Sequence, residues 1–390
     1  MTDAGREATG RGAGTEAPIA LFLPSLDGGG AERVVLRVAN ELAGRGVPVD
    51  LVLAEATGDY IHDVQPAVRV VDLESQRLLM ALPGLVRYLR RVRPRALLAS
   101  IAHTNVIAVL ARALAGTDTR IVLREANTVS KIRAHAGRLR ERAVAWAMPW
   151  AYPRADHIIA VSNGVATDLQ EALGIGTDEV TTIYNPTDVV ELRNRAEETV
   201  GHPWLEDGAD GPPVLLGIGR LSEQKDFGTL LRAFREVRDH RPARLIILGK
   251  GPRREALADL ARRLGVADAV SMPGFVDNPY AFIRRADLFV LSSAWEGMPN
   301  ALIEAFVLGA PIVSTDCPSG PSEILEGGRW GRLVPVGDVE AMGQATRKAL
   351  DEPVGSAEEA IEERTTDRFD IEDVGTQYLT LLTGTGTPTE

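Results

Sequence analysis

The chain has 390 residues, and its 54 acidic and 43 basic side chains give it a formal net charge of −11. This length is large for one domain, so we expect two domains that share a cleft. The acidic balance does not favour nucleic acid as a partner. With 45% hydrophobic and 25% charged residues, and no apolar run long enough to span a bilayer, the sequence is typical of a water-exposed globular protein.

Further classes of protein are excluded by the number of cysteines, the spacing of the histidines and the composition of the N-terminal residues. Cys317 is the only cysteine, and the six histidines show no close paired spacing, so neither a disulfide framework nor a metal site is expected. Residues 1–16 consist of Gly, Thr, Ala and charged residues and lack an apolar signal core. We therefore expect a cytoplasmic protein without a metal or other cofactor, in which residues 1–17 form a disordered tail.

In the first half, short β-rich runs alternate with helical patterns. In chain order, the sequence predicts a strand at 19–23, the glycine loop Gly28-Gly29-Gly30, a helix at 31–43, strands at 49–54 and 68–72, a helix at 78–92, a strand at 96–100, a helix at 105–115 and strands at 121–124, 157–161 and 180–183. This alternation predicts a parallel sheet with helices on both faces.

The alternation lapses at residues 191–212, a polar stretch that we interpret as a linker, and then restarts. The second half is predicted to contain a strand at 214–218, a helix at 229–238, a strand at 244–248, a helix at 254–264, a strand at 269–272, a helix at 280–285 and strands at 288–291, 312–315 and 332–334. The expected fold is α/β, with two Rossmann-like parallel-sheet domains, 18–190 and 213–368, facing each other across a cleft. Residues 369–384 are expected to form a helix that packs back on the first domain.

Two carboxylates in the second half are notable for their spacing. The stretch Glu-Gly-Met-Pro-Asn-Ala-Leu-Ile-Glu runs from Glu296 to Glu304 and follows a predicted buried strand. Pro299 and Asn300 open an apolar helix, so Glu296 is expected in the loop and Glu304 near the helix start. Anions are favoured at this edge of an α/β sheet, so the pair indicates sugar or ribose hydroxyls held beside a diphosphate. For Glu304, an acid that only complements the helix dipole is the alternative interpretation.

Basic and glycine-rich turns follow the other strands of the second half. Arg220 and Lys225 follow the first strand and suit a diphosphate, since a guanidinium and an ammonium together can neutralise it. A solvated surface pair is the alternative interpretation. Gly249 ends the second strand and could let the backbone approach a ligand, and Phe275 after the third strand could form an apolar wall for a base.

His103 in the first half is the remaining candidate side chain. It lies just past the predicted strand 96–100, at the edge of the sheet that faces the cleft. This position favours a role in the site, whereas a histidine taken alone is more often a satisfied core residue.

In combination, these stretches resemble the retaining GT-B glycosyltransferases of family 4 (glycosyltransferase group 1). The resemblance covers nearly the whole chain from Ile19 to about Leu382. It rests on several sequence features in the family's order: the glycine loop with Ala31-Glu32-Arg33, Gly219-Arg220-Leu221 with Lys225, Gly249-Lys250-Gly251, Pro273-Gly274-Phe275, the Glu296-to-Glu304 stretch and Cys317-Pro318-Ser319-Gly320-Pro321-Ser322-Glu323.

The resemblance implies a role for each matching residue. Arg220 and Lys225 would hold the nucleotide diphosphate, Glu304 the ribose hydroxyls, and Glu296 the donor sugar and its oxocarbenium-like transition state. His103 would face the donor sugar. The remaining donor contacts would come from Gly29, Gly30, Gly249, Phe275 and the helix-start residues Gly297, Met298, Pro299 and Asn300.

The family's chemistry is glycosyl transfer from a nucleotide sugar with retention of anomeric configuration, usually without a metal. The sequence contains no Asp-x-Asp triplet of the kind that metal-dependent glycosyltransferases use. We therefore expect catalysis by electrostatic stabilisation of the departing diphosphate and by positioning of the acceptor hydroxyl, with a UDP-sugar as donor.

A basic segment is the clue to the acceptor. Residues 77–154 contain fifteen Lys or Arg and only three acidic residues, with Trp146 and Trp150 near the end. Basic residues beside interfacial aromatics suit an anionic membrane surface or a lipid diphosphate, although a solvated helix face is the alternative. The stretch at 124–128, together with the segment from Cys317 to Glu323, resembles the subgroup that extends polyprenyl-diphosphate-linked glycans, often with N-acetylhexosamine. We expect a lipid-linked glycan acceptor in bacterial polysaccharide or glycoconjugate synthesis, and peripheral contact with the inner face of the cell membrane.

Other functions remain open at this point. A nicotinamide-dependent oxidoreductase is disfavoured because Arg33 stands where the dinucleotide fingerprint needs its third glycine. A UDP-sugar epimerase or hydrolase of the same fold, a transferase acting on a small natural product and a non-catalytic binding protein are the alternatives.

Overall fold

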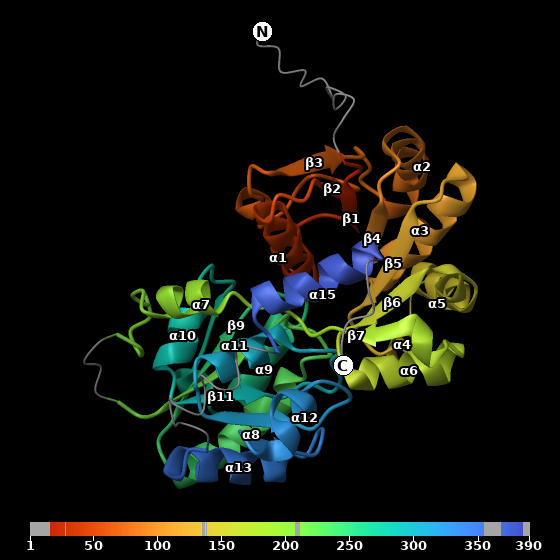
Figure 1. Cartoon of the computed structure of the whole chain (residues 1–390). Helices are drawn as coiled ribbons and strands as arrows, with labels where there is room; N and C mark the ends of the chain where they lie inside the picture. The colour runs from red at the N-terminus through yellow and green to blue at the C-terminus, as the bar shows by residue number, and fades with distance from the viewer. Residues whose placement is uncertain are drawn as a thin grey trace.

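The computed structural model describes residues 16–27, 29–134, 137, 139–206, 211–354 and 368–384. In Figure 1 the N-terminal half lies above the C-terminal half, and each half is built around one sheet. Gly28 and nearly all of the expected tail lie outside the described residues.

The N-terminal sheet has seven parallel strands in the order β3-β2-β1-β4-β5-β6-β7. Their bounds are β1 Ile19–Leu23, β2 Val49–Leu53, β3 Val68–Asp72, β4 Ala96–Ser100, β5 Arg120–Glu125, β6 His157–Ala160 and β7 Val180–Thr182. Every residue of β1, β2 and β4 is buried, which is why these strands read as nearly continuous apolar runs.

Helices cover both faces of this sheet. They are α1 Gly30–Gly44, α2 Ala81–Val92, α3 Ala102–Ala115, α4 Val129–Ala134, α5 Leu139–Ala151 and α6 Asn163–Leu173. Helices α4, α5 and α6 were not predicted, and α5 has only a weak amphipathic pattern because several of its apolar residues face outward.

The C-terminal sheet has six parallel strands in the order β10-β9-β8-β11-β12-β13. Its strands are β8 Val214–Ile218, β9 Arg244–Leu248, β10 Val270–Gly274, β11 Leu288–Leu291, β12 Ile312–Thr315 and β13 Arg332–Val334. Its helices are α8 Phe227–His240, α9 Arg254–Arg263, α10 Tyr280–Arg285, α11 Asn300–Val307, α12 Pro321–Ile324 and α13 Val339–Asp351.

Two further helices connect the halves. Helix α7 (Val189–Ala196) occupies part of the segment interpreted as a linker and packs against α10. Helix α15 (Ile371–Thr383) packs against α1 and β4 of the N-terminal half, as Figure 1 shows. The Tyr378 side chain of α15 is fully buried there.

Candidate functional site

The site lies where the strand order of each sheet reverses. β1 lies between β2 and β4, and β8 lies between β9 and β11, so the loops after these strands flank a topological switch point, the usual ligand position in open α/β sheets. The predicted residues follow these strands: Gly29 and Gly30 after β1, His103 after β4, Arg220 and Lys225 after β8, and Glu296 after β11.

Glu296 and Lys225 form the centre of the site. The carboxylate of Glu296 is buried, and its Oε1 lies 2.5 Å from the Lys225 ammonium. Ser293 donates a hydrogen bond to the same oxygen at 2.6 Å. An ammonium has three donors, so Lys225 can hold Glu296 and still donate to a ligand.

The loop after Glu296 contacts the N-terminal half directly. A Cβ on Gly297 would lie 2.0 Å from the carbonyl oxygen of Ala126, so only glycine fits at this approach. Asn300, the first residue of α11, donates a hydrogen bond to the carbonyl of Gly30 at 3.0 Å. The structure therefore brings Gly30 and the 297–300 loop together.

Glu304 is buried on α11 and faces two arginines of α1. Its Oε1 lies 3.7 Å from Arg33 Nη1 and 3.9 Å from Arg37 Nη2. Burial alone would lower the pKa of Arg33, but the negative charge of Glu304 outweighs it, so the net pKa is raised. Tyr280, whose hydroxyl accepts from Arg37 at 2.8 Å, has its pKa raised to about 12, first by burial and then by Glu304. Nothing in the sequence pattern indicated these partners from the other half.

The remaining predicted donor residues lie around this centre. The side chain of Arg220 is exposed, and it forms no hydrogen bond or ion pair with the described residues. Gly249 has a φ of 130°, and a Cβ there would lie 2.1 Å from the carbonyl oxygen of Gly219, so the turn after β9 requires glycine. Phe275 is 37% exposed, with the ammonium of Lys250 5.0 Å from its ring centroid.

His103 lies in the first turn of α3, after an unusual backbone turn. Ile101 has a φ of 80°, which costs a β-branched residue roughly 1–3 kcal/mol. Thr104 stabilises the turn by donating to the carbonyl oxygens of Ser100 and Ile101. Burial lowers the pKa of His103, and the charge of Arg140 adds to this effect, so the imidazole is neutral at pH 7. Its Nε2 is buried and has no hydrogen-bond partner within the described residues.

A buried hydrogen-bond network connects the N-terminal core to the donor loop. Arg124 Nη2 donates to Asn185 Oδ1 at 2.5 Å, and Arg124 Nε donates to the hydroxyl of Tyr378 at 3.1 Å. Asn185 Nδ2 donates to the carbonyl of Met298 at 2.9 Å and to Asn300 Oδ1 at 2.7 Å. Asn185 was not predicted as a site residue, because its importance comes from contacts more than a hundred positions away.

Glu125, at the end of β5, is fully buried beside this network. Its carboxylate accepts hydrogen bonds from Tyr152 Oη and from the backbone N–H groups of Ala126 and Asn127, the latter two at 3.0 and 3.2 Å. Burial nevertheless raises its pKa to about 7, although these hydrogen bonds oppose the shift. Glu125 therefore holds the turn that touches Gly297.

This raised pKa predicts a pH-dependent stability. Burial favours the protonated form of Glu125 in the folded state. The contribution of Glu125 to the free energy of unfolding is therefore complete below about pH 4.5 and is lost as the pH rises through about 7. Between pH 4.5 and 8, we expect the unfolding free energy of the wild type to fall by about 3 kcal/mol relative to Glu125→Gln. Urea unfolding at several pH values measures this, and parallel pH curves for the two proteins would contradict it.

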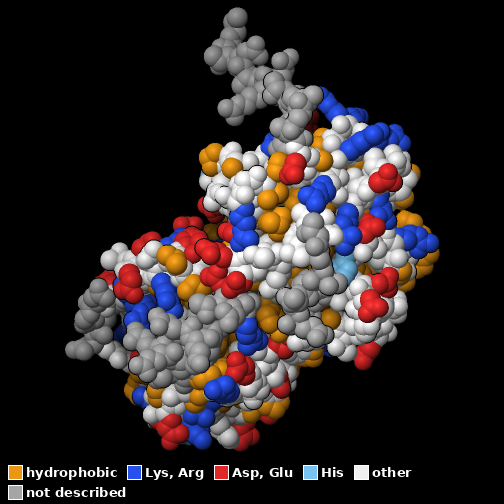
Figure 2. Space-filling view, viewed as in Figure 1, with side chains coloured by type: hydrophobic (Ala, Val, Ile, Leu, Met, Phe, Trp, Pro, Cys, Tyr) orange, Lys and Arg blue, Asp and Glu red, His pale blue; other side chains and the backbone are white. Residues whose placement is uncertain are grey.

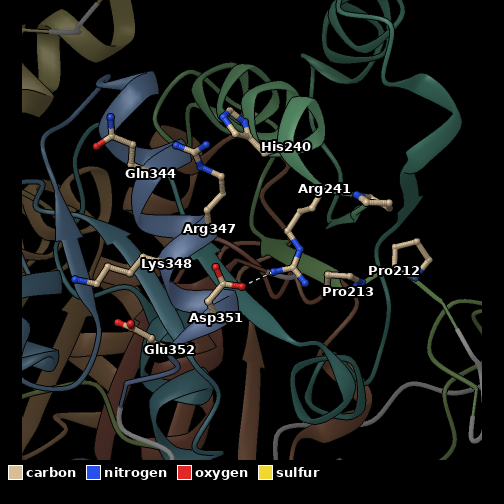
Figure 3. A pocket seen from close by; sticks show the side chains of 10 residues that line it. Pro212, Pro213, His240, Arg241, Gln344, Arg347, Lys348, Asp351 and Glu352 are labelled. Atoms are coloured by element: carbon tan, nitrogen blue, oxygen red, sulfur yellow. Dashed lines mark hydrogen bonds and ion pairs between the residues drawn. The ribbon is translucent and has the colours of Figure 1, made fainter.

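Two of the cavities in the described part of the chain bear on the location of the site. One of about 240 Å³ lies between the halves, lined from the N-terminal side by His103, Asn127 and residues of α4 and α5, and from the C-terminal side by Gln224 and Trp295. A hollow of about 1080 Å³ lies between α8 and α13 (Figure 3), where Arg241 pairs with Asp351 at 2.7 Å. Since no predicted site residue lines the larger hollow, size alone does not identify the site.

The described residues also bear on metal binding and on membrane insertion. Among them, no group of three or more His, Cys, Asp or Glu side chains is placed to hold a metal ion. None of the described helices combines the length and apolarity needed to cross a bilayer.

Comparison with known families gives two matches that together span most of the chain. Residues 28–191 match the family described as Glycosyltransferase Family 4. Residues 212–352 match the family described as Glycosyl transferases group 1.

Curated relatives and solved structures agree with these matches. The chain is 28% identical over 345 residues to the N-acetylgalactosamine-N,N'-diacetylbacillosaminyl-diphospho-undecaprenol 4-alpha-N-acetylgalactosaminyltransferase of Campylobacter jejuni, covering 86% of this chain and 90% of the relative. It is 26% identical to the lipopolysaccharide core biosynthesis glycosyltransferase LpsE of Rhizobium meliloti, covering 83% of this chain and 86% of the relative.

The structure of Anabaena Alr3699/HepE with UDP-glucose aligns with a TM-score of 0.78 at 19% identity, over 94% of this chain and 99% of that one. The apo structure of the lipopolysaccharide outer core galactosyltransferase WaaB aligns with a TM-score of 0.70 at 19% identity, over 95% and 100%. The expected two-domain α/β fold of the GT-B type is confirmed.

Proposed function

Because the chain belongs to the family 4 (group 1) glycosyltransferases, we propose that it transfers a sugar from a UDP-sugar to a lipid-linked glycan, with retention of configuration. The transferred sugar in this proposal is an N-acetylhexosamine, as in the name of the Campylobacter relative. The pathway is the synthesis of a bacterial surface polysaccharide or glycoconjugate, the setting named for the lipopolysaccharide relatives.

The pairing of Lys225 with Glu296 carries this proposal. A cation lies 2.5 Å from a buried carboxylate at a sheet switch point, and this pair supports the proposal because a departing diphosphate needs a positive charge and an oxocarbenium-like sugar a negative one. Lys225 and the unpaired Arg220 would stabilise the diphosphate as negative charge develops on it. Glu296 would stabilise the positive charge that develops on the sugar ring.

The other residues would position the donor. Both guanidinium contacts of Glu304 fall on Oε1, which leaves its second oxygen to accept from ribose hydroxyls. Gly29, Gly30 and the 297–300 loop offer backbone groups at two helix starts, where the helix dipole favours the diphosphate. Phe275 and Gly249 would border the base, and the neutral His103 would hydrogen-bond the donor sugar.

Nucleotide release from a panel of UDP- and GDP-sugars tests the function. The panel is run in the presence of EDTA, with and without a polyprenyl-diphosphate-linked N-acetylhexosamine. Release that needs one UDP-sugar and the lipid-linked acceptor supports the proposal. Donor consumption regardless of acceptor would favour an epimerase or hydrolase, and transfer to small hydroxylated natural products alone would favour that class of acceptor.

We further propose that α5 contacts the anionic lipids on the inner face of the cell membrane. Leu139, Trp146 and Trp150 are 85%, 83% and 39% exposed on this helix, and the Arg154 guanidinium lies 4.9 Å from the Trp150 ring. Figure 2 shows further Lys and Arg side chains over the N-terminal half, on the side of α2 and α3. Exposed aromatics flanked by cations suit the headgroup region of anionic lipids.

Vesicle cosedimentation checks this contact. Replacing Trp146 and Trp150 together with serine is expected to lower the partition coefficient on phosphatidylglycerol vesicles about tenfold or more, since each buried indole contributes well over 1 kcal/mol. Val190, 70% exposed on α7, supplies the matched control Val190→Ser. Equal binding of all three proteins would contradict the contact.

A further inference from the structure

The cavity between the halves lies beside the expected donor contacts. Of the residues assigned to the donor, only His103 lines it; Glu296, Lys225, Arg220 and Glu304 do not. Its C-terminal wall, Gln224 and Trp295, consists of the residues directly before Lys225 and Glu296. A ligand in the cavity would therefore lie next to the reacting centre without displacing the nucleotide.

The size of the cavity limits its occupant. Its volume of about 240 Å³ lies below the roughly 300–1000 Å³ of pockets that enclose whole drug-sized ligands. One sugar ring fits this space, whereas a nucleotide sugar or an oligosaccharide does not. Because both halves supply walls, the cavity exists only while the halves are together.

The lining has the mixed character that sugar rings require. Trp295, Ile132 and Val144 supply apolar surface for the C–H face of a ring, and the amides of Asn127 and Gln224 supply donors and acceptors for hydroxyls. The amides lie 3.4 Å apart across the seam between the halves.

The charge of the lining points to an uncharged ring. Lys131 and Glu141 contribute one positive and one negative side chain, and His103 is neutral at pH 7 because burial lowers its pKa. A ring with a carboxylate would find no net positive charge to offset its desolvation. A neutral hexose or N-acetylhexosamine meets no such penalty.

Helix α5 connects this cavity to the proposed membrane surface. Glu141 and Val144 line the cavity, whereas Leu139, Trp146 and Trp150 are exposed on the same helix. The helix has 13 residues and is therefore about 20 Å long. A lipid-linked acceptor could thus keep its lipid at the exposed aromatics while its sugar reaches the cavity.

We infer that this cavity is the subsite for the terminal, uncharged sugar ring of the acceptor, with Trp295 as its stacking platform. The inference rests on the proposed glycosyl transfer and deepens it. The acceptor hydroxyl would then be presented beside Glu296 by walls from both halves.

Filling the cavity from α5 tests this subsite. We expect Val144→Trp to raise the KM for GalNAc-N,N'-diacetylbacillosaminyl-diphospho-undecaprenol in detergent at least about tenfold, with UDP affinity changed by less than about twofold. Ala143→Trp adds the same bulk on the neighbouring, exposed position and should leave both values within about twofold of the wild type. If Val144→Trp folds poorly, Asn127→Ala is measured in its place. It is a smaller change and should also raise the KM for this acceptor.

The outcomes separate this inference from the proposed function. Transfer by the wild type tests the function, and the difference between Val144→Trp and Ala143→Trp tests the subsite. A Val144→Trp variant that loses UDP-sugar binding in parallel would assign the cavity to the donor sugar. Unchanged kinetics in Val144→Trp, or equal use of an acceptor that ends in a uronic acid, would also overturn the inference.

Discussion

Lys225→Ala is expected to lower kcat by about 10²–10³, the usual effect of removing one preorganised group that stabilises transition-state charge. The ammonium is 2.5 Å from Glu296 Oε1 and is the cation paired with that buried carboxylate. Its loss also leaves a buried charge without its partner, which typically costs about 3–5 kcal/mol of stability. Steady-state kinetics and urea unfolding of the same preparations measure both effects.

Two variants separate charge from packing at this position. Lys225→Arg keeps the charge and should recover part of the turnover. Ser293→Ala removes a neutral hydrogen bond to the same carboxylate oxygen and should cost only about 1 kcal/mol. If Lys225→Ala retains near-normal turnover while losing stability, the pair is structural and the diphosphate is stabilised elsewhere.

Glu304→Ala is expected to weaken UDP binding about 10- to 100-fold, because hydrogen bonds to a charged group contribute about 1.5–3 kcal/mol each. The variant also leaves Arg33 and Arg37 without the carboxylate that joins α1 to α11. Isothermal titration with UDP measures the affinity.

A nucleotide lacking one hydroxyl distinguishes the ribose contact from a loss of contact between the halves. The wild type should bind 2′-deoxy-UDP or 3′-deoxy-UDP more weakly than UDP, whereas Glu304→Ala should no longer discriminate against them. If both proteins discriminate equally, Glu304 acts only through Arg33 and Arg37. Arg33→Ala provides the matched control, since it breaks the same ion pair and leaves the carboxylate in place.

Helices α1 and α8, whose apolar stripes face a sheet, were predicted, whereas α13, which is similarly amphipathic and packs on β12 and β13, was not. Helix α8 has a strongly amphipathic pattern and was found, within two residues at each end. Helix α5 was missed because Leu139 and Trp146 point to solvent and disturb the periodicity. Helix α7 was missed because it is short and polar, and its stability comes from packing on α10.

Local sequence by itself determined the two parallel sheets and the loops that carry the chemistry. Buried strands read as apolar runs, and each of the loops after β1, β4, β8 and β11 contains polar residues or glycine close behind the strand. The turn after β9 could also be recognised from the sequence, because its positive φ favours glycine and Gly249 stands there. The candidate positions Glu296, Lys225 and His103 could therefore be proposed from the chain alone.

Only the tertiary structure decided which partners these residues have. The contacts of Glu304 with Arg33, of Asn185 with Met298 and of Asn127 with Gln224 join residues about 100 to 270 positions apart. Each depends on how the two halves meet, which is set by the summed packing of many side chains and by α15 crossing back to α1. No local pattern encodes these contacts, so the sequence predicted a cleft between the halves but not the residues that line the cavity in it.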